Sequence, residues 1–270
     1  MTASSGSAEC AVYSYKDGSS VECLREHVKE ALRLLKDAKN SNAVKYGERA
    51  FSSTVKTSYY STLKYALIMH DFGKTYFSRM FGGRDRITFT GHEIISAWIV
   101  EKLGQRFWKE LKVAFDPLLF SVLLHHHAMD IESRIDYFIN NKYNANKVII
   151  PSEDFRGFFE ELRDLEEIRP IEEAFYKLDE AKERISVVAM AESMKEELKS
   201  FHWHLTSDPQ SDSKMDHLRY LALFGLVVLD NVAASMRIKT KDSVRSVFQL
   251  SMEQTYRTYF GSTQLTAPQL

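Results

Sequence analysis

The side chains best suited to chemistry in this chain are histidines and aspartates that recur in one order. Six of the nine histidines fall between positions 27 and 127, and an aspartate follows in an apolar segment; the set is His27, His70, Asp71, His92, His125, His126, His127 and Asp230. Imidazole and carboxylate groups bind divalent metals at neutral pH. The two oxygens of one carboxylate can bridge two cations about 3.5–4 Å apart, so the set suits a two-metal centre that activates water for phosphoryl displacement.

Each of these residues also has a structural explanation when it is taken alone. A histidine near the apolar face of an amphipathic helix, such as His27, is usually structural, and a histidine triplet can lie on a surface. Asp230 adds independent weight, because an aspartate within an apolar helix has a desolvation cost unless it is paired or bound to metal. His202 and His204 lack carboxylate neighbours and His217 begins a polar helix, so we interpret these three as structural or solvated.

The histidine triplet leaves a question of register. Three successive residues on a helix sweep about 200° around its axis, so at least one of them should point away from a shared site. We therefore predict that His125 and His126 are ligands and that His127 is not, although His127 could replace one of them.

The periodicity of apolar residues places the candidate ligands on helices, several of them at helix ends. The expected elements are helices over about 20–37, capped by Ser19 and Glu22, over 59–71, over 91–103 and over 214–237, and a helix that opens at Asp116–Pro117 and ends in the histidine triplet. We expect residues 76–90 to form a loop and 128–151 an irregular surface excursion. With only 11 glycines and 5 prolines in 270 residues, the chain is predicted to be an all-α helical bundle with a central buried helix and a metal site between helices.

Length and composition indicate one soluble domain. A chain of 270 residues can bury one core, which we place at about 20–240, with residues 1–18 and 260–270 expected to be flexible. The net charge of −1 argues neither for nor against a nucleic-acid partner. Cys10 and Cys23 have no metal-type spacing, and we expect free thiols in a reducing compartment. The first nine residues lack the apolar core of a signal peptide, which favours a cytoplasmic protein.

Three short strings resemble a known family. MHDFGK at 69–74, GHE at 91–93 and LLHHH at 123–127 resemble the HD superfamily of metal-dependent phosphohydrolases, and most of all its CRISPR-associated nuclease of type I antiviral interference. The resemblance extends from His27 to about Ser235, where LDNVAAS is similar to the late aspartate motif. It implies an HD-domain bundle. The chain has no GxxxxGK[ST] phosphate loop, so it would be the stand-alone form, with a separate helicase subunit and the effector complex as partners.

The resemblance also implies roles for individual residues. One metal would be held by His27, His70, Asp71 and Asp230, and the other by Asp71, His92, His125 and His126. Asp71 and Lys74 would be catalytic, with the ammonium of Lys74 against the scissile phosphate; the alternative is a solvated loop lysine. A third histidine stands where many members of the family have glycine. Two divalent cations are expected, Mg²⁺ or Mn²⁺, with Ni²⁺, Co²⁺ or Fe²⁺ also compatible with histidine-rich ligation.

Basic and aromatic residues flank the expected metal site. Arg79, Arg84 and Arg86 alternate with Tyr76, Phe77, Phe81 and Phe89, and a second basic run contains Arg237, Lys239, Lys241 and Arg245. Cations for phosphates and aromatic rings for stacking are typical of single-strand binding, so we predict a nuclease for single-stranded DNA, with RNA also open. The alternatives are an ordinary mixed surface, a phosphohydrolase for dNTPs or cyclic nucleotides, and a non-catalytic interaction module.

Overall fold

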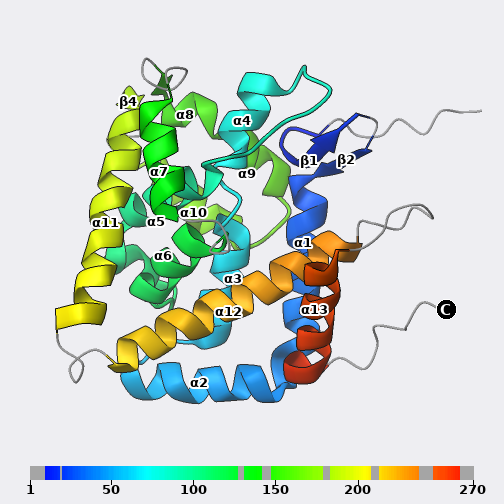
Figure 1. Ribbon diagram of the computed structural model, residues 1–270, viewed down its shortest axis with the longest axis vertical. Coiled ribbons are helices and arrows are strands. Elements are labelled where there is room, and N and C mark those ends of the chain that lie inside the picture. The colour runs from blue at the N-terminus through cyan, green and yellow to red at the C-terminus, as the bar shows by residue number, and fades with distance from the viewer. Residues whose placement is uncertain are drawn as a thin grey trace, which may run out of the picture.

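The computed structural model describes residues 10–18, 20–126, 131–141, 147–178, 183–207, 213–236 and 246–261, without the side chains of 202–207. It confirms the all-α class: helices dominate, and the described strands form two small antiparallel pairs (Figure 1). The strands are β1 (Tyr13–Asp17), β2 (Ser20–Cys23), β3 (Val148–Ile149) and β4 (Ile185–Ser186). β1 pairs with β2, and β3 pairs with β4.

The helices follow in chain order. The first half contains α1 (Leu24–Asp37), the 3-10 turn η1 (Ala38–Asn40), α2 (Asn42–Thr54), α3 (Tyr59–Met69), α4 (Lys74–Phe81), α5 (His92–Glu110) and α6 (Phe115–Leu124). The second half contains α7 (Ile131–Asn140), α8 (Pro151–Asp154), α9 (Arg156–Leu162), α10 (Ile168–Phe175), α11 (Val187–Ser207), α12 (Ser213–Met236), α13 (Val247–Thr255) and the π-helical turn η3 (Tyr256–Phe260).

Helix α12 lies at the centre of the bundle, as the sequence predicts. It packs against α1, α2, α3, α6 and α13, which surround it in Figure 1. Most of its apolar residues, among them Leu226, Leu229 and Val232, are buried, and burying each such side chain contributes about 1.5–3 kcal/mol. By length and composition α12 could cross a membrane, but 67% of its apolar window is buried inside the protein. That burial is what a core helix of a soluble protein shows.

The N-terminal region differs from its prediction. Residues 20–23 are not the first turn of the helix but strand β2, which pairs with β1 in a hairpin. Helix α1 begins at Leu24, and Glu26 rather than Glu22 caps it, since the Glu26 carboxylate accepts from the Cys23 backbone N–H. Ser19 lies outside the described residues. Val12 is fully buried, so the core extends into the segment that we expected to be flexible.

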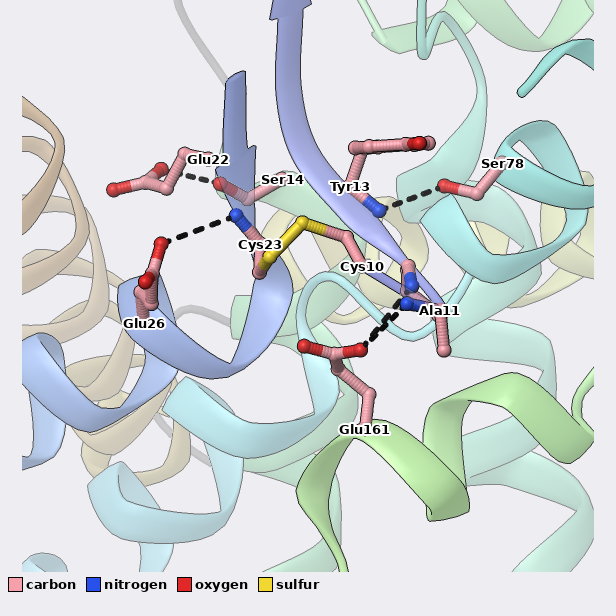
Figure 2. The surroundings of a disulfide bond; sticks show 10 residues. Cys10, Ala11, Tyr13, Ser14, Glu22, Cys23, Glu26, Ser78 and Glu161 are labelled. Carbon is pink, nitrogen blue, oxygen red and sulfur yellow. Dashed lines mark hydrogen bonds between the residues drawn. A yellow bond between two sulfur atoms is a disulfide. The ribbon is translucent and has the colours of Figure 1, made fainter. Parts of the chain in front are cut away.

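The cysteines contradict the prediction of free thiols. Cys10 and Cys23 form a disulfide that closes the base of the hairpin, with their Cα atoms 5.2 Å apart (Figure 2). The hairpin is also held from outside, because the Ala11 N–H donates to Glu161 and the Tyr13 N–H donates to Ser78. A loop of this length stabilises the fold by about 3 kcal/mol in the chain-entropy account. The disulfide removes the thiol argument for a reducing compartment.

Two segments expected to be irregular contain helices. Residues 74–81 form α4 instead of a loop, because Tyr76 and Phe77 are buried against the core and this burial favours a helical turn over an extended loop. Residues 131–140 form α7, with Ile135 and Phe138 buried. Helix α5 breaks at Gly104 as expected, with φ 77°, but a further helical stretch continues to Glu110.

Candidate metal centre

Five helices bring the predicted ligands to one place in the bundle. His27 lies on α1, His70 and Asp71 follow the last turn of α3, His92 begins α5, His125 and His126 follow the last turn of α6, and Asp230 lies on α12. All seven side chains are buried or partly buried. The turn after Asp71 passes close to α5: a Cβ on Gly73 would lie 2.2 Å from the His92 carbonyl oxygen. Only glycine allows this approach, which places Asp71 beside His92.

The first group of ligands is the carboxylate cluster, which comprises His27, His70 and Asp230. One ligand atom from each lies within 4.8 Å of the others. Nε2 of His27 is 2.9 Å from Oδ1 of Asp230, and Nε2 of His70 is 3.3 Å from the same oxygen. Three ligand atoms around one point, contributed by three helices, could hold a metal ion.

The second group is the histidine cluster, which comprises His92, His125 and His126 and meets the same 4.8 Å limit. Nε2 of His126 lies 3.3 Å from Nε2 of His92, and the His125 ring packs edge-on against His92 at 5.3 Å between centroids. The structure therefore places the pair that we predicted from the triplet in one cluster. His127 lies outside the described residues.

Asp71 stands between the two clusters, and its carboxylate is divided between them. Oδ2 lies 3.4 Å from Nε2 of His70 and 3.9 Å from Nε2 of His27, whereas Oδ1 lies 3.1 Å from Nε2 of His92. The side chain is 1% exposed. One oxygen per cluster is the arrangement that a bridging carboxylate needs.

Backbone carbonyls set the tautomers of three ligands. Nδ1 of His70, His92 and His125 lies 3.0, 2.6 and 2.7 Å from the carbonyl oxygens of Leu67, Phe89 and Val122, three residues earlier in each case. A carbonyl only accepts, so Nδ1 carries the proton and Nε2 presents a lone pair to the site. Within the described part of the chain, Nε2 of His70 and of His125 has no hydrogen-bond partner although it is buried. Such orphaned nitrogens fit a metal site.

His27 is held differently from the other ligands. Its Nε2 is the atom that donates to Asp230, and its Nδ1 faces Oε2 of Glu22 at 3.8 Å. To present Nε2 to a metal, His27 must carry its proton on Nδ1, on the side of Glu22. Glu22 is itself fixed by the Ser14 hydroxyl, which donates to it across the hairpin (Figure 2). Glu22 could not be identified from the sequence as a partner of His27, since only the hairpin brings the two side chains together.

The electrostatics of the two clusters differ. Burial opposes charge on His70, but Asp71 and Asp230 raise its pKa above the ordinary value. Burial likewise opposes charge on the two aspartates, yet the surrounding histidines, with Lys74 beside Asp71, hold both carboxyl pKa values well below their usual range. In the histidine cluster, burial and the neighbouring imidazoles lower the pKa of His125 well below its ordinary value and that of His126 to about 3. The two carboxylates are thus anionic at pH 7, and His125 and His126 are neutral.

Lys74 is part of the centre. Its ammonium lies 2.8 Å from Oδ2 of Asp71, donates to the Ser14 carbonyl at 3.2 Å and sits 5.4 Å above the Phe89 ring. The side chain is 14% exposed. This placement does not fit the alternative of a solvated loop lysine, and it sets a fixed positive charge at the edge of the metal centre.

The predicted nucleic-acid residues divide into two groups. Arg79 is bound to Asp154 at 2.5 Å and lies 3.5 Å from Glu153. Arg84 and Arg86 are exposed, as Arg79 is, but neither is held so closely by a carboxylate: the Arg84 guanidinium lies 4.5 Å over the Phe81 ring, and Arg86 is 3.8 Å from Asp17. The second basic run, 237–245, and the side chains of His202 and His204 lie outside the description. His217 is exposed and pairs with the Tyr46 hydroxyl at 3.0 Å.

A buried ion pair beside the metal centre was also missed. Glu93, directly after His92, is fully buried, and its Oε1 lies 2.5 Å from Nη2 of Arg134 on α7. The second Glu93 oxygen lies 3.5 Å from Nδ1 of His92. The pair anchors α7 to the start of α5. Sequence spacing gave no signal for it, because the two residues are far apart in the chain.

No protein-family model, curated protein or solved structure matches the chain.

Proposed function

We propose that this protein is a metal-dependent nuclease of the HD type that hydrolyses phosphodiester bonds in single-stranded DNA with two divalent cations. The observation that carries the proposal is the division of the Asp71 carboxylate, with one oxygen directed to each of two buried ligand clusters. It is the arrangement expected for two cations acting on one phosphate.

The donor set fits this pair of ions. One cation would be held by His27, His70, Asp71 and Asp230, and the other by Asp71, His92, His125 and His126. Mixed imidazole and carboxylate ligation suits Mn²⁺, Fe²⁺, Co²⁺ or Ni²⁺, and the carboxylates also suit Mg²⁺. The fixed Nδ1–H groups of three histidines support this fit, since they direct the Nε2 lone pairs inward before any metal arrives.

When bound, a pair of divalent cations supplies Lewis acidity and a water activated at neutral pH for in-line attack on phosphorus. The side chains of the protein do the rest. Asp71 remains ionised because its pKa is lowered, so both of its oxygens remain donors at neutral pH. Lys74, 2.8 Å from Asp71, places its ammonium where a phosphate oxygen bound beside Asp71 gains negative charge. The burial of the ligands excludes bulk water, which strengthens these electrostatic interactions.

The choice of nucleic acid rests on the surface beside the site. The exposed guanidinium groups of Arg84 and Arg86 are available to phosphates, while the Phe81 ring is already covered by Arg84. Binding of a polyanion at such cations is expected to weaken with salt. A helicase partner, a type I effector complex and a cytoplasmic location belong to the same proposal.

A substrate panel tests the proposal directly. Single-stranded DNA, double-stranded DNA, RNA, dNTPs and cyclic nucleotides are incubated with the purified protein, with and without Mn²⁺. We expect Mn²⁺-dependent cleavage of single-stranded DNA by the wild type and by Asp164→Ala, which removes an exposed carboxylate that pairs with Lys29 and belongs to neither cluster, but not by Asp71→Ala. Hydrolysis confined to dNTPs or cyclic nucleotides would replace the nuclease with a nucleotide phosphohydrolase. No hydrolysis of any substrate by metal-loaded protein would overturn the proposal.

A further inference from the structure

A pocket of about 230 Å³ lies beside the metal centre, between α4, the segment that follows it and the end of α7. Its lining combines aromatic and polar side chains: Tyr76, Phe77, Ile87 and Phe138 are buried there, and Tyr137 is exposed. The volume is below the range of about 300–1,000 Å³ that holds a drug-sized ligand. The pocket therefore suits one flat ring system and not a larger molecule.

The mouth of the pocket is polar and positively charged. Thr88, Thr90 and Asn141 contribute hydroxyl and amide groups to the lining, which can bond to the polar edge of a heterocycle. Arg84 and Arg86 line the same pocket and are exposed. An aromatic inner surface, polar edge groups and two guanidiniums at the entrance match a nucleobase attached to a phosphate.

The pocket and the metal centre share one wall, the segment 89–92. The Phe89 carbonyl accepts from Nδ1 of the ligand His92 at 2.6 Å, and the Phe89 ring lies beneath the Lys74 ammonium. Thr90, from the same segment, faces the pocket. Gly91 presses directly on Phe138: with φ 93°, its missing Cβ would lie 2.4 Å from the ring. A base in the pocket and a phosphate at Lys74 would thus lie on either side of the segment 89–92.

We propose that this pocket binds the nucleobase next to the phosphate that the metal centre hydrolyses. The inference rests on the proposed function and specifies how the substrate is held there. The ligand chemistry is a nucleobase linked to phosphate, and two sources supply it: one nucleotide within a DNA strand, or a free mononucleotide. In a strand, the base in the pocket fixes which phosphodiester lies beside Lys74.

Binding measured without catalysis tests the pocket by itself. The Kd of a fluorescein-labelled single-stranded 12-mer is measured by anisotropy in Ca²⁺ for the wild type and for Thr88→Trp, whose indole fills the pocket from an exposed position. Thr54→Trp, an exposed threonine on α2, is the matched control. Loss of one base–aromatic contact should raise Kd between about fivefold and a hundredfold in Thr88→Trp only.

A walk of single abasic sites along the oligonucleotide needs no variant that could misfold. One position should bind more weakly to the wild type by the same factor, and Thr88→Trp should be insensitive to that position. Competition by dTMP as strong as competition by the 12-mer would assign the pocket to free nucleotides; weak competition would assign it to the strand. Equal Kd values at every abasic position, together with an unchanged Kd in Thr88→Trp, would overturn the proposal that the pocket binds a nucleobase.

Hydrolysis of bis(p-nitrophenyl) phosphate separates this failure from failure of the function. The small diester needs the metal centre but has no nucleobase, so the wild type should hydrolyse it with Mn²⁺ whether or not the pocket binds a base. If the diester is hydrolysed while the abasic walk is flat, the pocket proposal fails and the metal-dependent hydrolase stands. If neither the diester nor any oligonucleotide is hydrolysed, the proposed function fails, and the anisotropy measurements still decide whether the pocket binds a base.

Discussion

The carboxylate cluster and the histidine cluster lie side by side, share Asp71 and have opposite electrostatics. His70 faces two carboxylates that raise its pKa, so His27, His70 and Asp230 form a group that is paired internally without metal. His125 and His126 face mainly other imidazoles, and their pKa values are lowered. Each cluster keeps a buried nitrogen without a hydrogen bond, Nε2 of His70 in the first and Nε2 of His125 in the second, but only the nitrogen of His70 faces the Asp230 carboxylate.

Because of this difference, we expect the two metal positions, one in each cluster, to respond separately to mutation and to pH. A cation entering the carboxylate cluster competes with a proton and a hydrogen bond that are already there. A cation entering the histidine cluster meets neutral lone pairs and displaces less. The shared carboxylate of Asp71 is the exception, because its loss should affect both positions.

Removal of Asp71, the side chain that the two clusters share, should have the largest effect. Asp71→Ala should lower single-stranded DNA cleavage by at least about a hundredfold, since loss of a direct ligand should exceed the 10–100-fold loss typical of outer partners. Bound metal, measured by mass spectrometry of the dialysed protein, should fall at both positions. Asp164→Ala is the control. A rate above about a tenth of wild type would exclude Asp71 as the bridging ligand.

The next pair of variants should separate the clusters. His126→Ala should weaken metal binding at the histidine cluster and Asp230→Asn at the carboxylate cluster, each by about 10–100-fold or more, leaving roughly one equivalent of metal in each variant. Metal stoichiometry and the metal-dependent rise in Tm measure this. His127→Ala should be milder than His126→Ala. Equal losses in the two histidine variants would show that the register of the pair is wrong.

The pH dependence of the metal-free protein should expose the histidine cluster. His125 and His126, with lowered pKa values, stay unprotonated in the folded state, while the same residues in the unfolded chain take up protons below about pH 6.5. Their contribution therefore makes the protein less stable as the pH is lowered. His70, with a raised pKa, acts in the opposite sense: its contribution is complete below about 6.5 and is lost as pH rises. The aspartates have lowered pKa values, and their contribution to stability is lost only as pH falls below the unfolded value of about 4. It therefore does not change between pH 5 and pH 7.

His125 and His126 should each lose about 2 kcal/mol and His70 should gain less than about 1 kcal/mol, so the unfolding free energy in chelator should fall by about 3 kcal/mol from pH 7 to pH 5. Urea denaturation at the two pH values measures the change, and His126→Ala should show a smaller fall. An identical pH response in wild type and variant would mean that His126 is freely protonated in the fold.

The smallest expected effect concerns Glu22, which lies 3.8 Å from Nδ1 of His27. Glu22→Gln should weaken metal binding at the carboxylate cluster by less than about tenfold and leave the histidine cluster unchanged, because Glu22 acts only through the tautomer of His27. Titration with Mn²⁺ resolves the two positions. A loss at both positions would indicate that the hairpin shapes the whole centre.

The residues that form the two clusters could be picked out from the sequence, because the signals that mark them are local. His70, Asp71, His92, His125 and His126 stand at helix ends marked by glycine, apolar periodicity and a proline-opened turn, and such signals act over a few residues. Asp230 was predictable for a related reason, since a carboxylate in an apolar helix needs a partner.

Other parts of the site could not be predicted, because they depend on contacts between distant segments. The hairpin of residues 13–23 and its disulfide arise from pairing across a turn, which overrode the helical periodicity of residues 20–23. Helix α4 formed because Tyr76 and Phe77 found a buried surface, whereas their composition is equally typical of a nucleic-acid-binding loop. The Glu93–Arg134 pair joins two helices that no spacing rule connects.

The sequence by itself determined the all-α class, the central helix α12 and the identity of the candidate ligands, because periodicity and capping are written in short stretches of residues. Only the tertiary structure decided that these ligands form two clusters, that the oxygens of Asp71 divide between them, and that Glu22, Lys74 and the aromatic pocket lie at their edge. Those features depend on distances between side chains on different helices. Such distances are set by the packing of the whole core, and no local pattern encodes them.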